Sequence, residues 1–432
     1  MKGQNKNLIY DTHEHPKTVK EWVLYAVQML MAVFVATVLI STICGTPVDA
    51  GLLGACLGTL TYQLITKFKS PIFISNSGAT VSAVLGALAL GATPNYFAVF
   101  IGGLVMLAIY GAFALFIKVR GIEAFNRLFP AYIIGPITIV IGLNLAGFIP
   151  TYVGLGASGS DISVLVAIAV MSVVSVSSHY FKGFLKTIPF LIGLVFGFAV
   201  CLVLELTGVT SYGIIDKLSN INGIFSVPNF AFLNWADGFK TFNFSTFINV
   251  VLLFAPIAVC ALCEHYSDHM VMSNIISHDL TKDPGLDRTL VGDGVATVVG
   301  TIFGGQPNTS YGESTAMVGF SRVASVKVVS LAALMMGLLA FLQPVQIFIA
   351  AIPSCVFGGC AMILYGYIAC SGLKTLMKNQ VDLENNKNLI IVSVILTVGV
   401  SGVYLFSNSF AGVSLAMTLG VILNLILRNK KE

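Results

Sequence analysis

The chain has 432 residues, of which 56% are hydrophobic and only 10% are charged, with a formal net charge of +4. Soluble domains carry about 25% charged residues, so this composition excludes a large soluble protein and indicates a polytopic helical membrane protein. The positive net charge does not indicate nucleic-acid binding, because the basic residues form no stripe interleaved with aromatic side chains.

In chain order, a polar tail over residues 1–20 precedes a series of apolar runs, and a short polar tail over 428–432 follows them. Hydropathy predicts fourteen membrane spans in this all-α chain, of which 289–303 and 307–321 are unusually short. The predicted spans are 21–44, 48–66, 71–91, 96–117, 131–148, 160–180, 187–208, 246–266, 289–303, 307–321, 326–343, 352–371, 388–406 and 409–427.

Lysine and arginine residues fall in alternate loops. Of the 23 basic residues, all except Lys217 and Lys240 lie in the two tails and in every second loop between predicted spans. Those two lysines lie in the one long loop on the opposite side. By the positive-inside rule, the basic loops and both termini are expected to be cytoplasmic, which requires an even number of spans.

The third span of each predicted half is interrupted in the same way. Seven spans in each half would place the halves in opposite orientations, which is an inverted repeat. Both third spans start with a proline, continue with residues that can be extended, and reach a glycine that begins a short helix. The residues are Pro71, Asn76, Ser77 and Gly78 in span three, and Pro307, Asn308, Tyr311 and Gly312 in span ten. The pattern predicts a short extended piece before a half-helix in each span, with both N-termini directed at one point. Two unrelated kinks are the alternative interpretation.

Two carboxylates lie within predicted spans. Glu264 follows an uncharged run from Phe247, and Glu313 directly follows the irregular segment 304–312. A carboxylate in the bilayer costs roughly 2.5–3.5 kcal/mol on insertion scales. Irregular backbone at that depth requires a covering of protein or contact with water. An acid beside a broken helix is typical of the substrate site of a transporter.

Further titratable residues follow Glu264 on the same span. Asp268 shares its helix face, whereas His265 and His269 share the neighbouring face. Glu264, Asp268, Glu313 and His269 are therefore candidates for carrying a coupling proton. For Asp268 and both histidines, the alternative is a solvated position at the cytoplasmic interface.

The sequence predicts no metal site and no cofactor. The histidines and carboxylates of 264–269 match no standard metal cage. Cys260 and Cys263 lie within a span without a second ligand pair, so they are interpreted as packing residues. Asp293 is expected to cap or brace the neighbouring broken helix, and Glu205 to lie at the outer interface.

The predicted site combines hydrogen-bond acceptors with donors. Ionised carboxylates only accept hydrogen bonds, and free backbone N–H groups only donate them. A planar heterocycle that carries ring N–H donors and carbonyl acceptors side by side satisfies both sets. A carboxylate that gains or loses a proton would couple binding to the proton gradient, whereas two acids would repel a simple anion.

At these residues the chain resembles the nucleobase–ascorbate transporter family, and within it the bacterial uracil permeases. The matching segments are Glu264-His265 followed by Asn274, the run 282–286, and the highly specific run 307–313 that ends in Gly-Glu. The segments 58–60 and 141–143 add support, and the similarity extends along nearly the whole chain.

The resemblance implies fourteen spans in a seven-plus-seven inverted repeat, with a core domain (21–118 and 246–343) and a gate domain (131–208 and 352–427). It implies a multi-pass transporter of the bacterial inner membrane, commonly a homodimer. Such transporters couple a nucleobase to protons or sodium, here through an elevator-like movement. Uracil or a close pyrimidine is the expected substrate. The alternatives are a purine permease for xanthine, guanine or uric acid, and an anion channel or exchanger of the same fold.

The resemblance also implies a set of binding residues. By position they are Glu264, Glu313, Gly312, Tyr311, Gly78 and Ser77, with Pro71, Asn76, Pro307 and Asn308 as structural residues of the broken spans. The two glutamates would accept hydrogen bonds from the pyrimidine ring. Backbone N–H groups near the two glycines would donate to its carbonyls.

The chain departs from the family pattern at several positions. Met29 stands where the first span usually has histidine, and Asp268 stands where the uracil pattern has histidine. Ser314 and Ala316 alter the signature that follows the site glutamate. Gly78 replaces an aromatic residue, which opens room beside the expected ligand.

Overall fold

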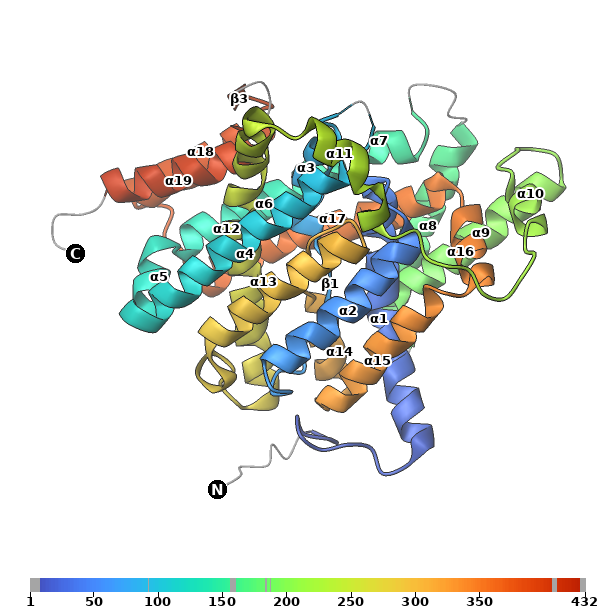
Figure 1. Ribbon diagram of the computed structural model, residues 1–432, viewed down its shortest axis with the longest axis horizontal. Coiled ribbons are helices and arrows are strands. Elements are labelled where there is room, and N and C mark those ends of the chain that lie inside the picture. The colour runs from blue at the N-terminus through green and yellow to red at the C-terminus, as the bar shows by residue number, and fades with distance from the viewer. Residues whose placement is uncertain are drawn as a thin grey trace.

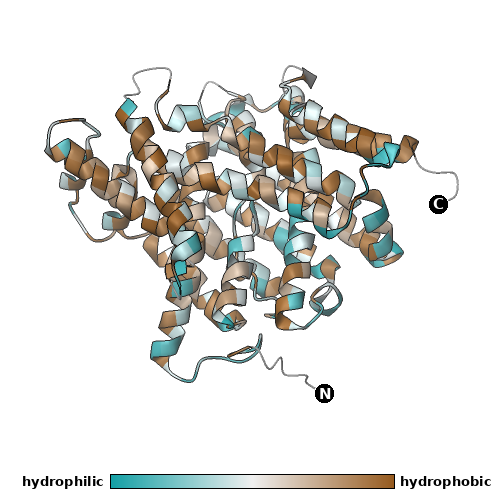
Figure 2. Ribbon diagram, turned by 180° about the vertical axis from the view of Figure 1, so that it is seen from behind, coloured by the Kyte–Doolittle hydropathy of each residue, from teal (hydrophilic) through white to brown (hydrophobic). Residues whose placement is uncertain are grey.

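A computed structural model describes residues 8–91, 93–155, 161–182, 185–186, 188–405 and 410–427. Most of this chain is helical, and Figure 2 shows hydrophobic residues along most helices and hydrophilic residues gathered in loops and at helix ends. Among the described residues, eight helices are long and apolar enough to cross a membrane. The prediction of a multi-pass helical protein is confirmed. The predicted tail 428–432 and residues 1–7 lie outside the described residues.

The first half of the chain contains one interrupted span between long helices. Its elements are α1 (Val19–Cys44), α2 (Val48–Ile65), β1 (Ile74–Asn76), the 3₁₀ turn η1 (Gly78–Thr80), α3 (Val81–Leu88), α4 (Tyr96–Arg120), α5 (Ile122–Leu128), α6 (Ala131–Ala146), α7 (Ile149–Tyr152), α8 (Asp161–Tyr180) and α9 (Pro189–Leu206). The side chains of Thr18 and Asn95 accept hydrogen bonds from the first turns of α1 and α4, and Gly45 ends α1 in a left-handed conformation.

The second half follows a long loop and contains a second interrupted span. Its elements are α10 (Ile214–Ser219), η3 (Ala231–Asn234), α11 (Trp235–Thr241), α12 (Phe244–Ile276), η4 (Thr281–Gly285), α13 (Leu286–Phe303), β2 (Asn308–Ser310), α14 (Gly312–Ser321), α15 (Val326–Leu339), α16 (Gln343–Ala351), α17 (Ser354–Lys378), α18 (Asn386–Val400), β3 (Tyr404–Leu405), β4 (Phe410–Ala411) and α19 (Val413–Ile426). Helix α12 begins at the side-chain cap of Asn243.

Helices occur at the predicted spans, but several boundaries were wrong. Helix α12 continues to Ile276, past the predicted end at 266, because its backbone stays hydrogen-bonded and His265 and His269 are buried against neighbouring helices. The short loop helices, among them α5, α10, α11 and α16, and the β3–β4 hairpin were not predicted. Their hydrophobic signal is too short to register as a span.

The long helices pack as two groups. In the first group, α2, α4 and α12 surround α13 and α3, while α15 and α1 pack against α2. Figure 1 shows α13, α2 and α15 side by side across one face. In the second group, α6, α8 and α9 pack around α17, and α18 and α19 pack against α6. The groups meet where α12 contacts α19 and α6, and where α1 contacts α9.

The two interrupted spans cross inside the first group. Strands β1 and β2 are antiparallel, with Ile74 opposite Ser310 and Asn76 opposite Asn308. The ladder extends by one hydrogen bond at each end, from Ser77 N to the Pro307 carbonyl (2.9 Å) and from Tyr311 N to the Phe73 carbonyl (3.0 Å). The predicted extended piece before each half-helix is therefore confirmed, with η1–α3 and α14 as the half-helices.

Polar side chains fix each strand to its neighbours. The Asn76 amide donates to Ser41 Oγ (2.9 Å) of α1, and the Asn308 amide donates to the Gly54 carbonyl (2.9 Å) of α2. Thr59 Oγ1 donates to the Ile74 carbonyl (2.6 Å), and Thr297 Oγ1 donates to the Asn308 carbonyl (2.7 Å). These bonds satisfy backbone and amide groups that hydrocarbon would leave unpaired.

Candidate functional site

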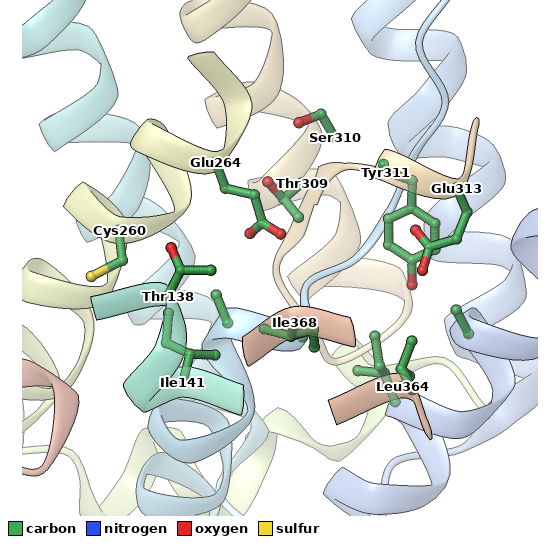
Figure 3. A pocket seen from close by; sticks show the side chains of 15 residues that line it. Thr138, Ile141, Cys260, Glu264, Thr309, Ser310, Tyr311, Glu313, Leu364 and Ile368 are labelled. Carbon is green, nitrogen blue, oxygen red and sulfur yellow. The ribbon is translucent and has the colours of Figure 1, made fainter. Parts of the chain in front are cut away.

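A cavity of about 80 Å³ lies where the strand pair, both half-helix tips and α12 meet α6 and α17 (Figure 3). One wall is polar and the other is apolar. The lining residues are Ala36, Ile40, Gly78, Ala79, Thr138, Ile141, Cys260, Glu264, Thr309, Ser310, Tyr311, Gly312, Glu313, Leu364 and Ile368. The cavity therefore lies between the two helix groups, within the membrane-spanning part of the protein.

The polar wall carries both predicted glutamates. Glu264 projects from the middle of α12, and Glu313 projects from the first turn of α14. Although protein surrounds it, Glu264 is exposed toward this space, and Glu313 is partly exposed. The hydroxyl side chains of Thr309 and Ser310 lie between them on β2. This wall offers several acceptors and two hydroxyl groups that both donate and accept.

The half-helix tips supply backbone donors to the same cavity. The first N–H groups of a helix have no intrahelical partner. Neither Ser77 nor Tyr311, the residues that precede η1 and α14, caps them with its side chain. Gly312 is exposed at the tip of α14, and Gly78 lines the cavity at the tip of η1. Glycine at these positions places no side chain over the first N–H groups.

Asp268 occupies the edge of the site. Its carboxylate accepts a hydrogen bond from Ser310 Oγ (2.9 Å), which joins α12 to β2. It also lines a larger vestibule of about 630 Å³ that shares Glu264 and Glu313 with the cavity and extends toward Lys186 and Lys374. The alternative of a simply solvated position at the interface is therefore wrong for Asp268.

The alternative of a solvated position at the interface is wrong for the two histidines of α12. His265 and His269 are both 0% exposed. They face away from the cavity, toward Asp293 on α13 and Tyr62 on α2, respectively. The reason is that α12 extends past its predicted end and packs its polar face against these helices. Asp293, expected to cap or brace the broken helix, lies beside that histidine face and is also 0% exposed.

Other predicted residues have structural contacts. Tyr311 lines the cavity, and its hydroxyl donates to the Asn76 carbonyl (2.8 Å), which ties one broken span to the other. Ser77 does not line the cavity, and its hydroxyl is buried. Pro71 and Pro307 are buried where the extended pieces begin. Glu205 ends α9 and accepts hydrogen bonds from the N–H groups of residues 212, 214 and 215 (2.9–3.1 Å).

The positions that depart from the family pattern have distinct surroundings. Met29 is buried within α1. Ser314 Oγ donates to the Tyr311 carbonyl (2.7 Å) and accepts from Phe73 N (3.2 Å), so it helps to hold the strand crossing. Ala316 is exposed to the vestibule.

The second helix group supplies site residues that sequence reasoning missed. Thr138 and Ile141 of α6, with Leu364 and Ile368 of α17, form the apolar wall opposite the glutamates. Of these four residues, only Thr138 stood out in the sequence, because it is a polar residue within a predicted span. The others are ordinary apolar span residues, and nothing in the sequence distinguishes them from lipid-facing ones.

Two interrupted helices that meet inside a multi-pass bundle, with carboxylates beside their N-termini, define a membrane transporter. Residues 20–408 match the model of a permease family of xanthine and uracil permeases. The chain belongs to this family, the nucleobase–ascorbate transporter family to which the sequence resemblance pointed. It is a permease and not an enzyme.

Relatives of known name are similar over nearly their whole length. The chain is 34% identical to the uracil permease of Bacillus caldolyticus, over 98% of this chain and 96% of that protein. It is 34% identical to the uracil permease of Escherichia coli strain K12, over 93% of this chain and 90% of that protein. It is 29% identical to a putative pyrimidine permease of the same strain, over 94% and 89%.

Solved structures share the fold at low identity. The transmembrane domain of a cyanobacterial bicarbonate transporter, BicA, superimposes with a TM-score of 0.63 at 15% identity, over 96% of this chain and 99% of that one. The structure of SLC26A9 superimposes with a TM-score of 0.64 at 14% identity, over 95% and 66%. The prediction of a transporter fold is confirmed.

Proposed function

We propose that this protein imports uracil or a closely related pyrimidine across the inner membrane of a bacterium, together with protons. One observation carries the proposal: Glu264, Glu313 and both half-helix tips line a single cavity between the two helix groups. The uracil permease names of relatives that share 34% identity over nearly the whole chain support a pyrimidine as substrate.

The chemistry of the cavity fits a neutral planar ring. A uracil ring presents N–H donors and carbonyl acceptors around one edge. The carboxylates of Glu264 and Glu313 accept from ring N–H groups, and the N–H groups at Gly78 and Gly312 donate to ring carbonyls. The apolar wall of α6 and α17 covers the remaining ring atoms and excludes water.

The two helix groups correspond to the expected domains. We assign the group of α1–α4 and α12–α15 to the core domain, and the group of α6, α8, α9 and α17–α19 to the gate domain. The matched strand crossings of β1 and β2 support the fourteen-span inverted repeat. The alternating lysines and arginines support cytoplasmic termini.

Transport follows from movement of the core against the gate. The vestibule leads from the cavity toward Lys186 and Lys374, which lie on the face assigned to the cytoplasm, so this conformation releases substrate inward. The site residues on η1, β2, α12 and α14 belong to the core. An elevator-like displacement of the core carries them across the membrane while α6 and α17 stay fixed in a homodimer held by the gate.

Coupling requires a group that changes its charge with binding. Two carboxylates in one cavity repel each other, and a proton on one of them relieves this repulsion. We propose that one of three carboxylates carries this proton: Glu264, Glu313 or the adjoining Asp268. Sodium is the alternative coupling ion.

Uptake of radiolabelled uracil by a permease-deficient bacterium tests the function directly. We expect accumulation above background, and its collapse when an uncoupler removes the proton gradient. Background uptake would contradict the substrate. Uptake that survives the uncoupler but fails without sodium would replace the proton by sodium.

A purine permease is the second candidate, because Gly78 leaves room for about one methyl group beside the cavity. A Cβ atom there would contact Ile40 Cδ1 and Ile368 Cδ1 at 3.7 and 3.9 Å, which are ordinary contacts. We expect unlabelled uracil to inhibit uptake more strongly than xanthine, guanine or uric acid. Stronger inhibition by one of these purines would favour the second candidate.

An anion transporter is disfavoured, although both fold relatives quoted above come from anion-transporter families. Glu264 and Glu313 face the cavity, and none of the described residues that line it is a lysine or an arginine. Two acids would repel a bicarbonate-like anion.

A further inference from the structure

A buried polar cluster lies behind the polar wall of the cavity, on the side away from the substrate. It consists of His265 and His269 on α12, Asp293 on α13 and Tyr62 on α2, each of them 0% exposed. It lines none of the cavities described above. These are titratable groups for which the substrate-facing chemistry has no use.

At the centre of the cluster, a histidine and a carboxylate lie close together without a well-formed hydrogen bond. His265 Nδ1 lies 2.9 Å from Asp293 Oδ2, within ion-pair distance. The contacts of both ring nitrogens of His265 and of both oxygens of Asp293 fall outside strict hydrogen-bond geometry among the described residues, although the Thr309 hydroxyl lies beside the carboxylate. A buried carboxylate whose contacts are this incomplete costs several kcal/mol. A proton is the smallest ligand that removes this cost.

The hydrogen bonds of His269 can hold an additional proton on its imidazole ring. Its Nδ1 donates to the His265 carbonyl (2.8 Å), since a carbonyl only accepts. Its Nε2 lies 2.7 Å from the Tyr62 hydroxyl, which is hydrogen-bonded to Ser70 Oγ (2.9 Å). With Tyr62 as the donor to Ser70, both nitrogens of His269 carry hydrogen, which is the imidazolium. With Ser70 as the donor to Tyr62, the Tyr62 hydroxyl donates to Nε2 and His269 is neutral, so the chain of hydrogen bonds accommodates both protonation states. The two imidazole rings lie 4.0 Å apart, so one of them at a time bears the charge.

Acidic groups on several elements surround the cluster. Glu264 and Asp268 of α12 lie near Asp293, and Glu313 of α14 lies near both of them. The Tyr62 hydroxyl on α2 and the Tyr110 hydroxyl on α4 also lie near Asp293. A proton bound to the cluster is therefore attracted by the carboxylates of the site, and its loss makes the site more negative.

The cluster has contacts that lead in both directions. Asp293 lies beside the Thr309 hydroxyl, and Thr309 also lines the substrate cavity (Figure 3). In the other direction, Tyr62 and Ser70 lead toward Lys69, which is only partly buried in the loop after α2. A proton therefore has hydroxyl groups on either side along which to move.

We propose that His265, His269 and Asp293 form a second proton-binding site of the transporter, which binds and releases one proton in each transport cycle. This proposal rests on the proposed proton-coupled uptake. It adds a binding site for a proton that has no contact with the substrate. Thr309 passes the proton between this site and the cavity. Tyr62 and Ser70 pass it toward the loop of residues 67–69.

The test compares Asp293→Asn and His269→Gln with wild-type protein in proteoliposomes. His179→Gln, an exposed histidine at the end of α8, is the matched control. Three quantities are measured: binding of radiolabelled uracil, exchange of labelled for unlabelled uracil without a gradient, and accumulation driven by an inward proton gradient. Two separate variants keep the test valid if one of them fails to fold.

We expect both variants to bind and exchange uracil like the wild type but to lose gradient-driven accumulation, and the pH dependence of uptake to flatten. Accumulation that stays at the wild-type level would overturn the proposal. Loss of binding, exchange and thermal stability together would also overturn it, because that pattern indicates a structural role. Proton uptake by the purified protein after a pH drop, without substrate, separates the two proposals. A wild type that does not bind uracil contradicts the proposed function, and variants that take up as many protons as the wild type contradict the second site.

Discussion

At the scale of single residues, Glu264 and Glu313 determine what the cavity accepts. Both carboxylates are surrounded by protein yet open to the same small space, so each can form a charged hydrogen bond without competition from bulk water. Gln at either position keeps the size of the side chain but replaces one acceptor oxygen by a donor. That donor would face a ring N–H.

We therefore predict that Glu264→Gln and Glu313→Gln each weaken uracil binding by roughly tenfold or more. A hydrogen bond to a charged group is worth about 1.5–3 kcal/mol, which is roughly tenfold to more than a hundredfold in affinity. The check is a scintillation proximity assay on purified protein, with Glu123→Gln on the exposed surface of α5 as the control. Full-strength binding in either site variant would refute the role of that glutamate.

The sequence was most informative about residues whose chemistry conflicts with their surroundings. Glu264 and Glu313 stand out because an acid within an apolar span needs a reason, and the structure brings both to one cavity. The direction in which a side chain points depends on helix ends and partners. The sequence therefore left open whether His265 and His269 lie at the membrane interface or at the site. Only their contacts with α2 and α13 reveal that they are buried.

At the scale of elements, the crossing of β1 and β2 depends on close packing against α2. A Cβ atom on Gly58 of α2 would lie 2.1 Å from the Asn308 amide nitrogen. That amide cannot move freely, because it donates to the carbonyls of Gly54 (2.9 Å) and Ala296 (3.3 Å). Any side chain at Gly58 therefore displaces β2 and, with it, the start of α14.

We predict that Gly58→Ala lowers the free energy of unfolding by about 1–3 kcal/mol, as overpacking typically does, and weakens uracil binding. Gly111→Ala on α4 is the control, since nothing lies within 4 Å of its Cβ position. Alanine in place of glycine within a helix is stabilising by roughly 0.5–1 kcal/mol, so the control should melt at the same temperature or higher. Equal melting temperatures for both variants would show that the crossing has room to adjust.

The loop after α2 and the turn before α13 are joined by an ion pair. The Lys69 ammonium beside Asp283 holds the pKa of that carboxyl below its ordinary value. A lowered pKa stabilises the fold above the pKa of the unfolded chain, and this contribution is lost as the pH falls through the folded value, below about pH 4.

We predict that Asp283→Asn lowers the melting temperature slightly at pH 7, and that the difference from wild type begins to shrink as the pH falls below about 4. Because the pair is about half exposed and screened by water, the contribution is expected to be about 0.2–1 kcal/mol. Thermal unfolding of the purified protein at pH 7 and at a pH below about 4 measures it. A difference that grows as the pH falls would contradict the assignment.

Element boundaries were predictable where a cap or a breaker marks them. The prolines and glycines of 71–78 and 307–312 indicated a broken helix, and the structure places a strand and a half-helix there. The pairing of these strands could not be derived from either segment alone, since each is too short to specify a register. The end of α12 was missed because His265 and His269 are covered by other helices, although they read as polar interface residues in the sequence.

At the scale of the whole molecule, access to the site is one-sided. The cavity joins the vestibule that extends toward Lys186 and Lys374. A separate cavity of about 870 Å³ on the other side, lined by Thr46 and Asp49 among others, shares no lining residue with the site. The proposed cytoplasmic release therefore requires that the vestibule open to the inside of the cell.

We predict that a cysteine at position 316 reacts with a membrane-impermeant thiol reagent in inside-out vesicles but not in intact cells. Ala316 lines the vestibule, and a cysteine at Ser211 should show the opposite preference because Ser211 is exposed and lines the outer cavity. The parent for both variants carries Cys370→Ser, since Cys370 is the exposed cysteine among those described. Labelling of position 316 from outside alone would reverse the proposed orientation.

Binding of radiolabelled uracil to the purified wild-type protein, with unlabelled nucleobases as competitors, tests the central claim most directly. If opposed half-helix tips and two acids enclose a neutral pyrimidine, the protein binds labelled uracil saturably. Unlabelled uracil then displaces the label more effectively than any purine does. Absence of saturable uracil binding from folded protein, or displacement by a purine or a simple anion ahead of uracil, would contradict it.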